Sequence, residues 1–150
     1  MKKSFISKII SIILIIILFF GVISLPFMPK LYDMFKDTTI ETFNNHLPIY
    51  KIAFYSCYLI GLFIVYELIR LFNIIYKGSP FRKEIEDYLK VMAVMFMILF
   101  LIVIVKAVFI PTLLTFVVAL LCFLMSLAFY VLAEVIKMAI KYKTEVDFTV

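Results

Sequence analysis

Long runs of apolar residues, separated by short polar stretches, dominate the pattern of this chain. The first run covers residues 9–28 without a charged side chain, and the second covers residues 52–72. A helix needs about 20 mostly apolar residues to cross the hydrocarbon core of a bilayer. Each of these two runs is therefore predicted to be one transmembrane helix.

The next apolar stretch is too long for a single crossing. It covers residues 91–133 and contains one charged residue, Lys106. At a rise of about 1.5 Å per residue, one helix of this length would be about twice as long as a bilayer core is thick. Pro111 interrupts the stretch, because proline cannot continue the hydrogen-bond ladder of a helix. The sequence therefore predicts two further spans, at residues 91–110 and 112–136.

The predicted fold class is an all-α integral membrane protein, a single domain of four transmembrane helices arranged as two hairpins. An outer loop at residues 29–51, a polar segment at residues 73–90 and a tail at residues 137–150 complete the chain. With four spans, both termini and residues 73–90 share one side, which carries eleven of the fifteen basic residues. The positive-inside rule then predicts that both termini face the cytoplasm, in a bacterial cytoplasmic membrane.

The composition of the chain agrees with a lipid bilayer as its main partner. Hydrophobic residues make up 66% of the chain and the mean hydropathy is +1.17, whereas a soluble domain is usually about 45–50% apolar. The net charge of +5 would allow a basic face for nucleic acid. The positions of Lys and Arg fit topology signals better, so direct nucleic acid binding is not expected.

Ionisable residues in or beside the spans form a first group of candidate site residues: Glu67, Arg70, Lys106, Glu134 and Lys137. Each Glu precedes a basic residue by three positions on the same helix face, so one interpretation is a pair of local ion pairs. The other is that the two carboxylates face each other and share a proton or a cation. Lys106 lies toward the opposite surface, where its long side chain could snorkel to the interface.

The polar segment and the tail supply a second group of candidates, for binding a protein partner. Each carries a Phe flanked by charged residues, on the same predicted side of the membrane. The candidate residues are Ser79, Pro80, Phe81, Arg82, Glu145, Asp147 and Phe148. Ser79 is a good N-cap and Pro80 suits the first helical position, so a helix is predicted to begin there.

The sequence contains no recognisable catalytic constellation. The single histidine, His46, lies in the outer loop, and 3 glycines leave no Gly-rich phosphate loop. We therefore do not expect an enzyme, a cofactor or a metal site. Cys57 and Cys122 both lie in apolar runs and are expected to be unpaired.

Two short motifs point to a known family. The chain reads GSPF at residues 78–81 and ends in EVDFTV at residues 145–150. They resemble the Asn-Pro-Phe and Glu-x-Asp-Leu-Thr-Val motifs of the bacterial membrane family called domain of unknown function 2975, with Ser for Asn and Phe for Leu. The resemblance implies four spans in the cytoplasmic membrane and no established activity. Because genes of that family often neighbour a small helix-turn-helix regulator, it also implies a membrane partner of such a regulator.

The expected function is that of a regulatory or sensory membrane protein. It would bind a soluble cytoplasmic helix-turn-helix regulator through residues 73–90 and the tail. The alternative is a small transporter or an immunity protein against membrane-active peptides, for which Glu67, Glu134, Lys106 and the outer loop are the motivation. A homo-oligomer is a further expected partner under this alternative, since four spans alone enclose little space.

Overall fold

The computed structural model describes residues 5–30, 47–78 and 81–149. All the regular secondary structure in these residues is helical. Its long helices are α1 (Phe5–Ser24), α4 (Leu47–Lys77), α5 (Lys83–Phe109) and α6 (Leu113–Thr149), and a 3-10 turn, η1 (Leu25–Phe27), follows α1. Within the described residues, four helices are long and apolar enough to cross a membrane. The predicted all-α class with four such helices is confirmed, and it indicates a multi-pass membrane protein.

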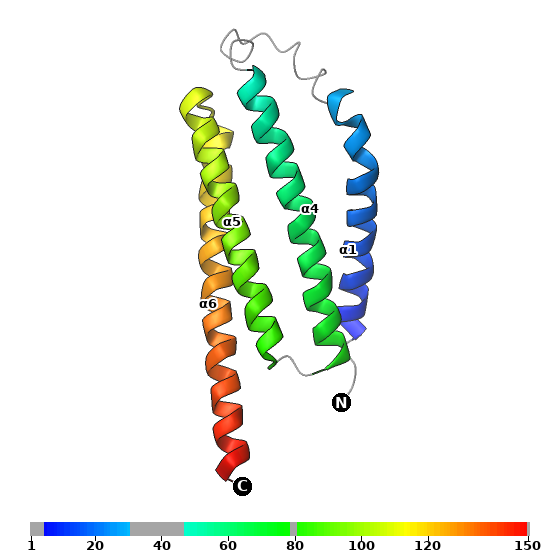
Figure 1. Cartoon of the computed structure of the whole chain (residues 1–150), viewed down its shortest axis with the longest axis vertical. Helices are drawn as coiled ribbons and strands as arrows, with labels where there is room; N and C mark the ends of the chain where they lie inside the picture. The colour runs from blue at the N-terminus through cyan, green and yellow to red at the C-terminus, as the bar shows by residue number, and fades with distance from the viewer. Residues whose placement is uncertain (1–4, 31–46, 79–80, 150) are drawn as a thin grey trace.

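The helices lie side by side in an elongated bundle (Figure 1). α1 packs along α4, α5 packs along α6, and α4 also contacts α5. The Phe5 end of α1 and the Thr149 end of α6 lie toward the same end of the bundle, the lower end in Figure 1. The connection between α5 and α6 lies toward the opposite end, as does the Leu47 end of α4.

α6 is the longest helix and continues past the other three at the lower end of Figure 1. Its 37 residues correspond to a length of about 55 Å, which exceeds the bilayer core of about 30 Å. Tyr142, Val146 and Phe148 in its last turns are 67%, 60% and 86% exposed. As far as Thr149, the predicted tail is therefore a helical continuation of α6 beyond the bundle.

α5 begins at Lys83, which corrects the predicted start at Ser79 and Pro80. These two residues lie outside the described part of the chain, but Phe81 and Arg82 are described and are not helical. Arg82 is the N-cap with extended backbone (φ −122°, ψ 143°) and makes no side-chain cap. Two acidic residues in the first turn of α5 favour this start instead, because they face the positive end of the helix dipole.

The break between α5 and α6 falls at Pro111, as the proline predicts. Ile110 closes the end of α5 by donating its N–H to the Lys106 carbonyl oxygen at 2.9 Å. Thr112 caps α6, since the Thr115 N–H donates to its Oγ1 at 3.2 Å. These two bonds pair the Lys106 carbonyl oxygen and the Thr115 N–H, which are polar groups at the two helix ends.

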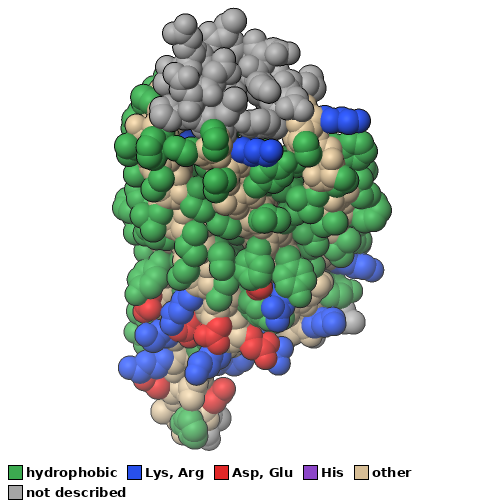
Figure 2. Space-filling model, turned by 45° about the horizontal axis from the view of Figure 1, so that its top comes forward, with side chains coloured by type: hydrophobic (Ala, Val, Ile, Leu, Met, Phe, Trp, Pro, Cys, Tyr) green, Lys and Arg blue, Asp and Glu red, His purple; other side chains and the backbone are tan. Residues whose placement is uncertain are grey.

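The best-packed part of the bundle lies where α4, α5 and α6 meet near the lower end. Leu71, Ile85, Leu89 and Ala133 form its buried cluster, and Phe72, Tyr88 and Phe129 are among the side chains packed against it. Elsewhere most large apolar side chains of α1 and α6 are exposed. Figure 2 shows these side chains as a broad hydrophobic band, with charged side chains gathered below it. A bilayer is the solvent that suits such a band.

Candidate functional site

Most of the ion pairs in the described residues lie at one end of the bundle, which we call the charged end. It comprises the last part of α4 with Glu67 and Arg70, residues 81–90, and residues 134–149 of α6. Figure 2 shows acidic and basic side chains intermingled there. The pairs and their N–O distances are Arg70–Glu67 (3.4 Å), Arg82–Glu84 (3.9 Å), Lys90–Glu86 (2.5 Å), Lys137–Glu134 (3.6 Å) and Lys141–Glu145 (4.0 Å).

Glu67 is the most deeply buried of the predicted ionisable residues, with 4% of its surface exposed. Its Oε1 lies 3.4 Å from Nη1 of Arg70, and its Oε2 is buried without a hydrogen-bond partner among the described atoms. The Arg70 guanidinium also lies 4.8 Å from the ring centre of Tyr88 on α5 and 5.7 Å from that of Tyr66. Arg70 therefore connects a buried acid on α4 to an aromatic ring on α5.

Glu134 has a different environment from Glu67. Its side chain is 36% exposed, and it pairs with Lys137 at 3.6 Å. Each glutamate is thus paired with the basic residue three positions later, which is the local arrangement that the spacing allowed. No hydrogen bond joins the two carboxylates, since Oε1 of Glu67 faces Arg70 and Oε2 has no partner among the described atoms. The geometry gives no support to a shared proton.

Glu86 is an acid of the polar segment that was not among the predicted site residues, and the structure buries it. Glu86 is 7% exposed, and the Lys90 ammonium donates a hydrogen bond to its Oε1 at 2.5 Å. The signal that could have found this pair is the Glu-to-Lys spacing of four residues in a helix. The pair supports the start of α5, where the helix leaves the polar segment and joins the packed cluster of α4 and α6.

The predicted partner-binding residues divide between two elements of the charged end. Phe81 is 44% exposed and precedes α5 together with Arg82, whereas Glu145, Asp147 and Phe148 lie in the last turns of α6. Ser79 and Pro80 lie outside the described residues. Both segments lie toward the lower end in Figure 1, with α6 extending beyond the Lys77 end of α4 and the Lys83 end of α5. The structure thus places the two segments toward one end of the bundle.

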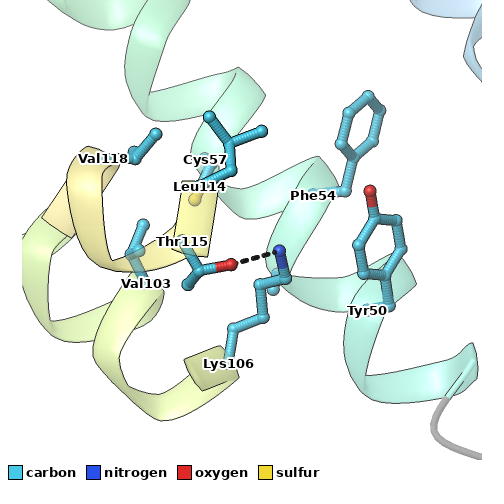
Figure 3. A pocket seen from close by; sticks show the side chains of 9 residues that line it. Tyr50, Phe54, Cys57, Val103, Lys106, Leu114, Thr115 and Val118 are labelled. Atoms are coloured by element: carbon cyan, nitrogen blue, oxygen red, sulfur yellow. Dashed lines mark hydrogen bonds between the residues drawn. The ribbon is translucent and has the colours of Figure 1, made fainter. Parts of the chain in front are cut away.

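The opposite end of the bundle contains a small pocket around Lys106 (Figure 3). Its volume is about 160 Å³, and α4, α5 and α6 all contribute to its lining. The Lys106 ammonium donates a hydrogen bond to Thr115 Oγ1 at 3.1 Å and lies 4.9 Å from the ring centre of Tyr50. Thr115 Oγ1 is also 2.6 Å from Thr112 Oγ1. Lys106 thus lies between helices, with hydroxyl and aromatic contacts.

The part of the chain that is described contains neither a disulfide nor a cluster of metal-binding side chains. Cys57, which lines the Lys106 pocket, and Cys122 are both unpaired, as predicted. No group of three or more His, Cys, Asp or Glu within those residues could hold a metal ion. The described residues form a mixed-charge surface at one end of the bundle and a pocket with a lysine at the other.

No protein-family model matches the chain, and neither the curated proteins nor the solved structures contain a match. The resemblance to the family called domain of unknown function 2975 stays a prediction from two short motifs.

Proposed function

We propose that this chain is a regulatory or sensory membrane protein, not an enzyme, and that it holds a soluble partner at its charged end. The observation that carries the proposal is the projection of α6 past the other helices. Tyr142, Val146 and Phe148 are exposed there among side chains of both charges. Exposed apolar side chains within the span contact lipid. Beyond the span they face water, where exposed apolar side chains often mark a surface that binds another protein.

The topology that we propose has two helical hairpins, α1 with α4 and α5 with α6, and both ends of the chain in the cytoplasm of a bacterial cell. It is supported by the excess of Lys and Arg at the charged end and beside the N-terminus, because basic residues favour the cytoplasmic side. In this orientation residues 73–90 and the end of α6 are accessible to one soluble cytoplasmic protein.

The end of α6 suggests how a partner would bind. Tyr142 and Val146 are four residues apart and share a helix face, and Lys141 pairs with Glu145 at 4.0 Å beside them. A helix with such a face suits a partner groove that is apolar at its centre and charged at its rim. Following the resemblance, we propose a small helix-turn-helix regulator as this partner, with Phe81 and Arg82 as a second contact.

A pull-down from native membranes tests the proposal. An affinity tag inserted at Asn44 leaves both segments of the charged end unmodified. We expect a soluble protein to be captured with the full chain and lost when residues 142–150 are deleted, while the truncated chain still inserts into the membrane. Mass spectrometry of the captured material identifies the partner and shows whether it has a helix-turn-helix sequence.

A matched pair of point variants distinguishes partner contact from general damage to α6. Val146 and Val131 lie on the same helix and are 60% and 59% exposed, but Val131 lies within the apolar span. Val146→Ser should reduce partner capture, and Val131→Ser should leave it unchanged. Full capture by the truncated chain would refute the proposal. A preparation that contains only copies of the chain itself would favour the transporter or immunity alternative.

A further inference from the structure

The Lys106 pocket lies at the end of the bundle opposite the proposed partner site and is independent of that proposal. Lys106 is the one charged residue in residues 91–133, and it lies one turn before α5 ends at Phe109. The ion pairs found among the described residues all involve other side chains. An ammonium beside a span is costly when no described carboxylate pairs with it, and such groups usually mark a functional site.

Two contacts hold the Lys106 ammonium between the helices. Thr115 at the start of α6 accepts its hydrogen bond at 3.1 Å, and the Tyr50 ring on α4 lies 4.9 Å away. Figure 3 shows the side chain directed toward Thr115 and the pocket. A lysine that only snorkels would extend toward water and headgroups. Here the ammonium is held by residues of two other helices, α4 and α6. An anion that binds Lys106 would therefore contact it at the pocket between these helices.

An apolar groove begins at the same lysine. It lies between α4 and α5, has a volume of about 490 Å³, and shares Ala53 and Lys106 with the smaller pocket. Aliphatic residues including Ile52, Leu101 and Val105 line it, and these three are 68%, 55% and 56% exposed. The groove is therefore open on the outer surface of the bundle, where lipid chains are the surrounding medium in a membrane.

We propose that Lys106 and this groove bind an anionic phospholipid. The ammonium of Lys106 contacts the lipid phosphate, Thr115 and Tyr50 position the ammonium, and an acyl chain lies along the groove between α4 and α5. The two halves of the site match the two halves of the ligand: one fixed positive charge beside an open apolar surface. Basic pockets between transmembrane helices bind anionic lipid headgroups at the cytoplasmic side of membranes, and the Lys106 pocket offers the same pairing of charges at the other side.

The acyl part of the ligand is what separates this proposal from binding of a soluble phosphate ester. A small anion would contact Lys106 but would leave the groove to other lipids. A phospholipid would contact Lys106 and also fill the groove. Its acyl chain would add to the binding free energy by burying apolar area against residues such as Ala53. The ligand is thus a membrane lipid, and its net negative charge distinguishes it from a zwitterionic lipid with the same chains.

Native mass spectrometry of the full chain in detergent tests the proposal. The probes are dioleoyl phosphatidylglycerol, dioleoyl phosphatidylcholine with identical chains, and soluble glycerol 3-phosphate. Both lipids offer a phosphate to Lys106, but the choline cation of the zwitterionic lipid repels the ammonium, so we expect the anionic lipid to bind about tenfold more tightly. Glycerol 3-phosphate should not displace it. Equal binding of the two lipids, or displacement by glycerol 3-phosphate, would overturn the proposal.

Variants assign the charge and the groove separately. Lys106→Gln should abolish the preference for the anionic lipid, Lys106→Arg should keep it, and Lys51→Gln removes the same charge from an exposed position of α4 as a control. Ala53→Leu narrows the groove without changing the charge, so it should weaken the binding of both lipids. If Lys106→Gln does not fold, two results still test the proposal. They are the comparison of the two lipids on the unmodified chain and the binding of both lipids to Ala53→Leu. An unchanged preference in folded Lys106→Gln would contradict the site.

Discussion

At the scale of single residues, the bundle tolerates the buried acid Glu67 because a neighbouring cation partly compensates its charge. Glu67 is 4% exposed, and one of its oxygens has no hydrogen-bond partner among the described atoms. Arg70 supplies the countercharge while its guanidinium is held over the Tyr88 ring. Removing one member of a buried pair costs more than removing both, because the remaining charge stays buried without compensation.

We therefore predict that Arg70→Gln destabilises the protein by about 2 kcal/mol, a value reduced from that of fully buried pairs because Arg70 is partly exposed. Adding Glu67→Gln to that variant should restore most of the loss. Lys137→Gln is the matched control, since it breaks an ion pair of the same three-residue spacing whose acid is half-exposed. Its effect should stay below about 0.5 kcal/mol. Circular dichroism of denaturant titrations in detergent measures each value. Equal losses for Arg70→Gln and Lys137→Gln would contradict the prediction.

At the scale of elements, α1 is attached to α4 through its small residues. Ser7 and Ser11 are buried, whereas Ile12, Ile16 and Phe20 on the same helix are exposed. The Leu62 side chain of α4 lies against Gly21, because a Cβ atom there would lie 2.5 Å from Leu62 Cδ2. In lipid there is little hydrophobic driving force between helices, so close packing and interhelical hydrogen bonds hold them together.

Two serines on α1 allow a paired prediction. Ser7 Oγ donates a hydrogen bond to the Phe72 carbonyl oxygen of α4 at 2.8 Å, whereas Ser11 Oγ is buried without a partner among the described atoms. Ser7→Ala should cost about 0.6 kcal/mol, the usual value for a polar contact between membrane helices. Ser11→Ala should be neutral or stabilising, because it removes an unsatisfied hydroxyl. The same denaturation assay compares them, and a larger loss for Ser11→Ala would refute this account of the α1–α4 contact.

At the scale of the whole molecule, an apolar band separates two chemically different ends. The charged end carries the projecting part of α6, and the other end carries the Lys106 pocket (Figures 2 and 3). The band itself is covered by exposed apolar side chains and belongs in lipid. A protein with this form can contact a soluble molecule on one side of a membrane and a lipid on the other.

The proposed orientation predicts the behaviour of two reporter proteins. Alkaline phosphatase fused after Val150 should be inactive, because it needs disulfides that form outside the reducing cytoplasm. A green fluorescent protein at the same position should fluoresce, and alkaline phosphatase inserted at Asn44 should be active. These three readings follow from the positive-inside rule applied to the charged end. Active phosphatase at the C-terminus would reverse the orientation and remove the cytoplasmic partner.

How much the sequence reveals depends on whether a feature is local. The four apolar helices and the break at Pro111 are predictable, because hydropathy and the missing proline N–H act within one segment. The Glu67–Arg70 and Glu134–Lys137 pairs are likewise given by helix spacing. The start of α5 at Lys83 was missed because a good cap at Ser79 competes with acidic residues in the next turn, and both are local signals.

The sequence by itself therefore determined that this is a membrane-spanning helical chain with its charge concentrated in particular segments. Only the tertiary structure decided that Glu67 is buried while Glu134 is half-exposed, that Ser7 meets Phe72, and that Lys106 meets Tyr50 and Thr115. The physical reason is that helices apolar on every side carry no stripe to show which face meets a neighbour. Contacts between helices then depend on how small and polar side chains fit together in three dimensions.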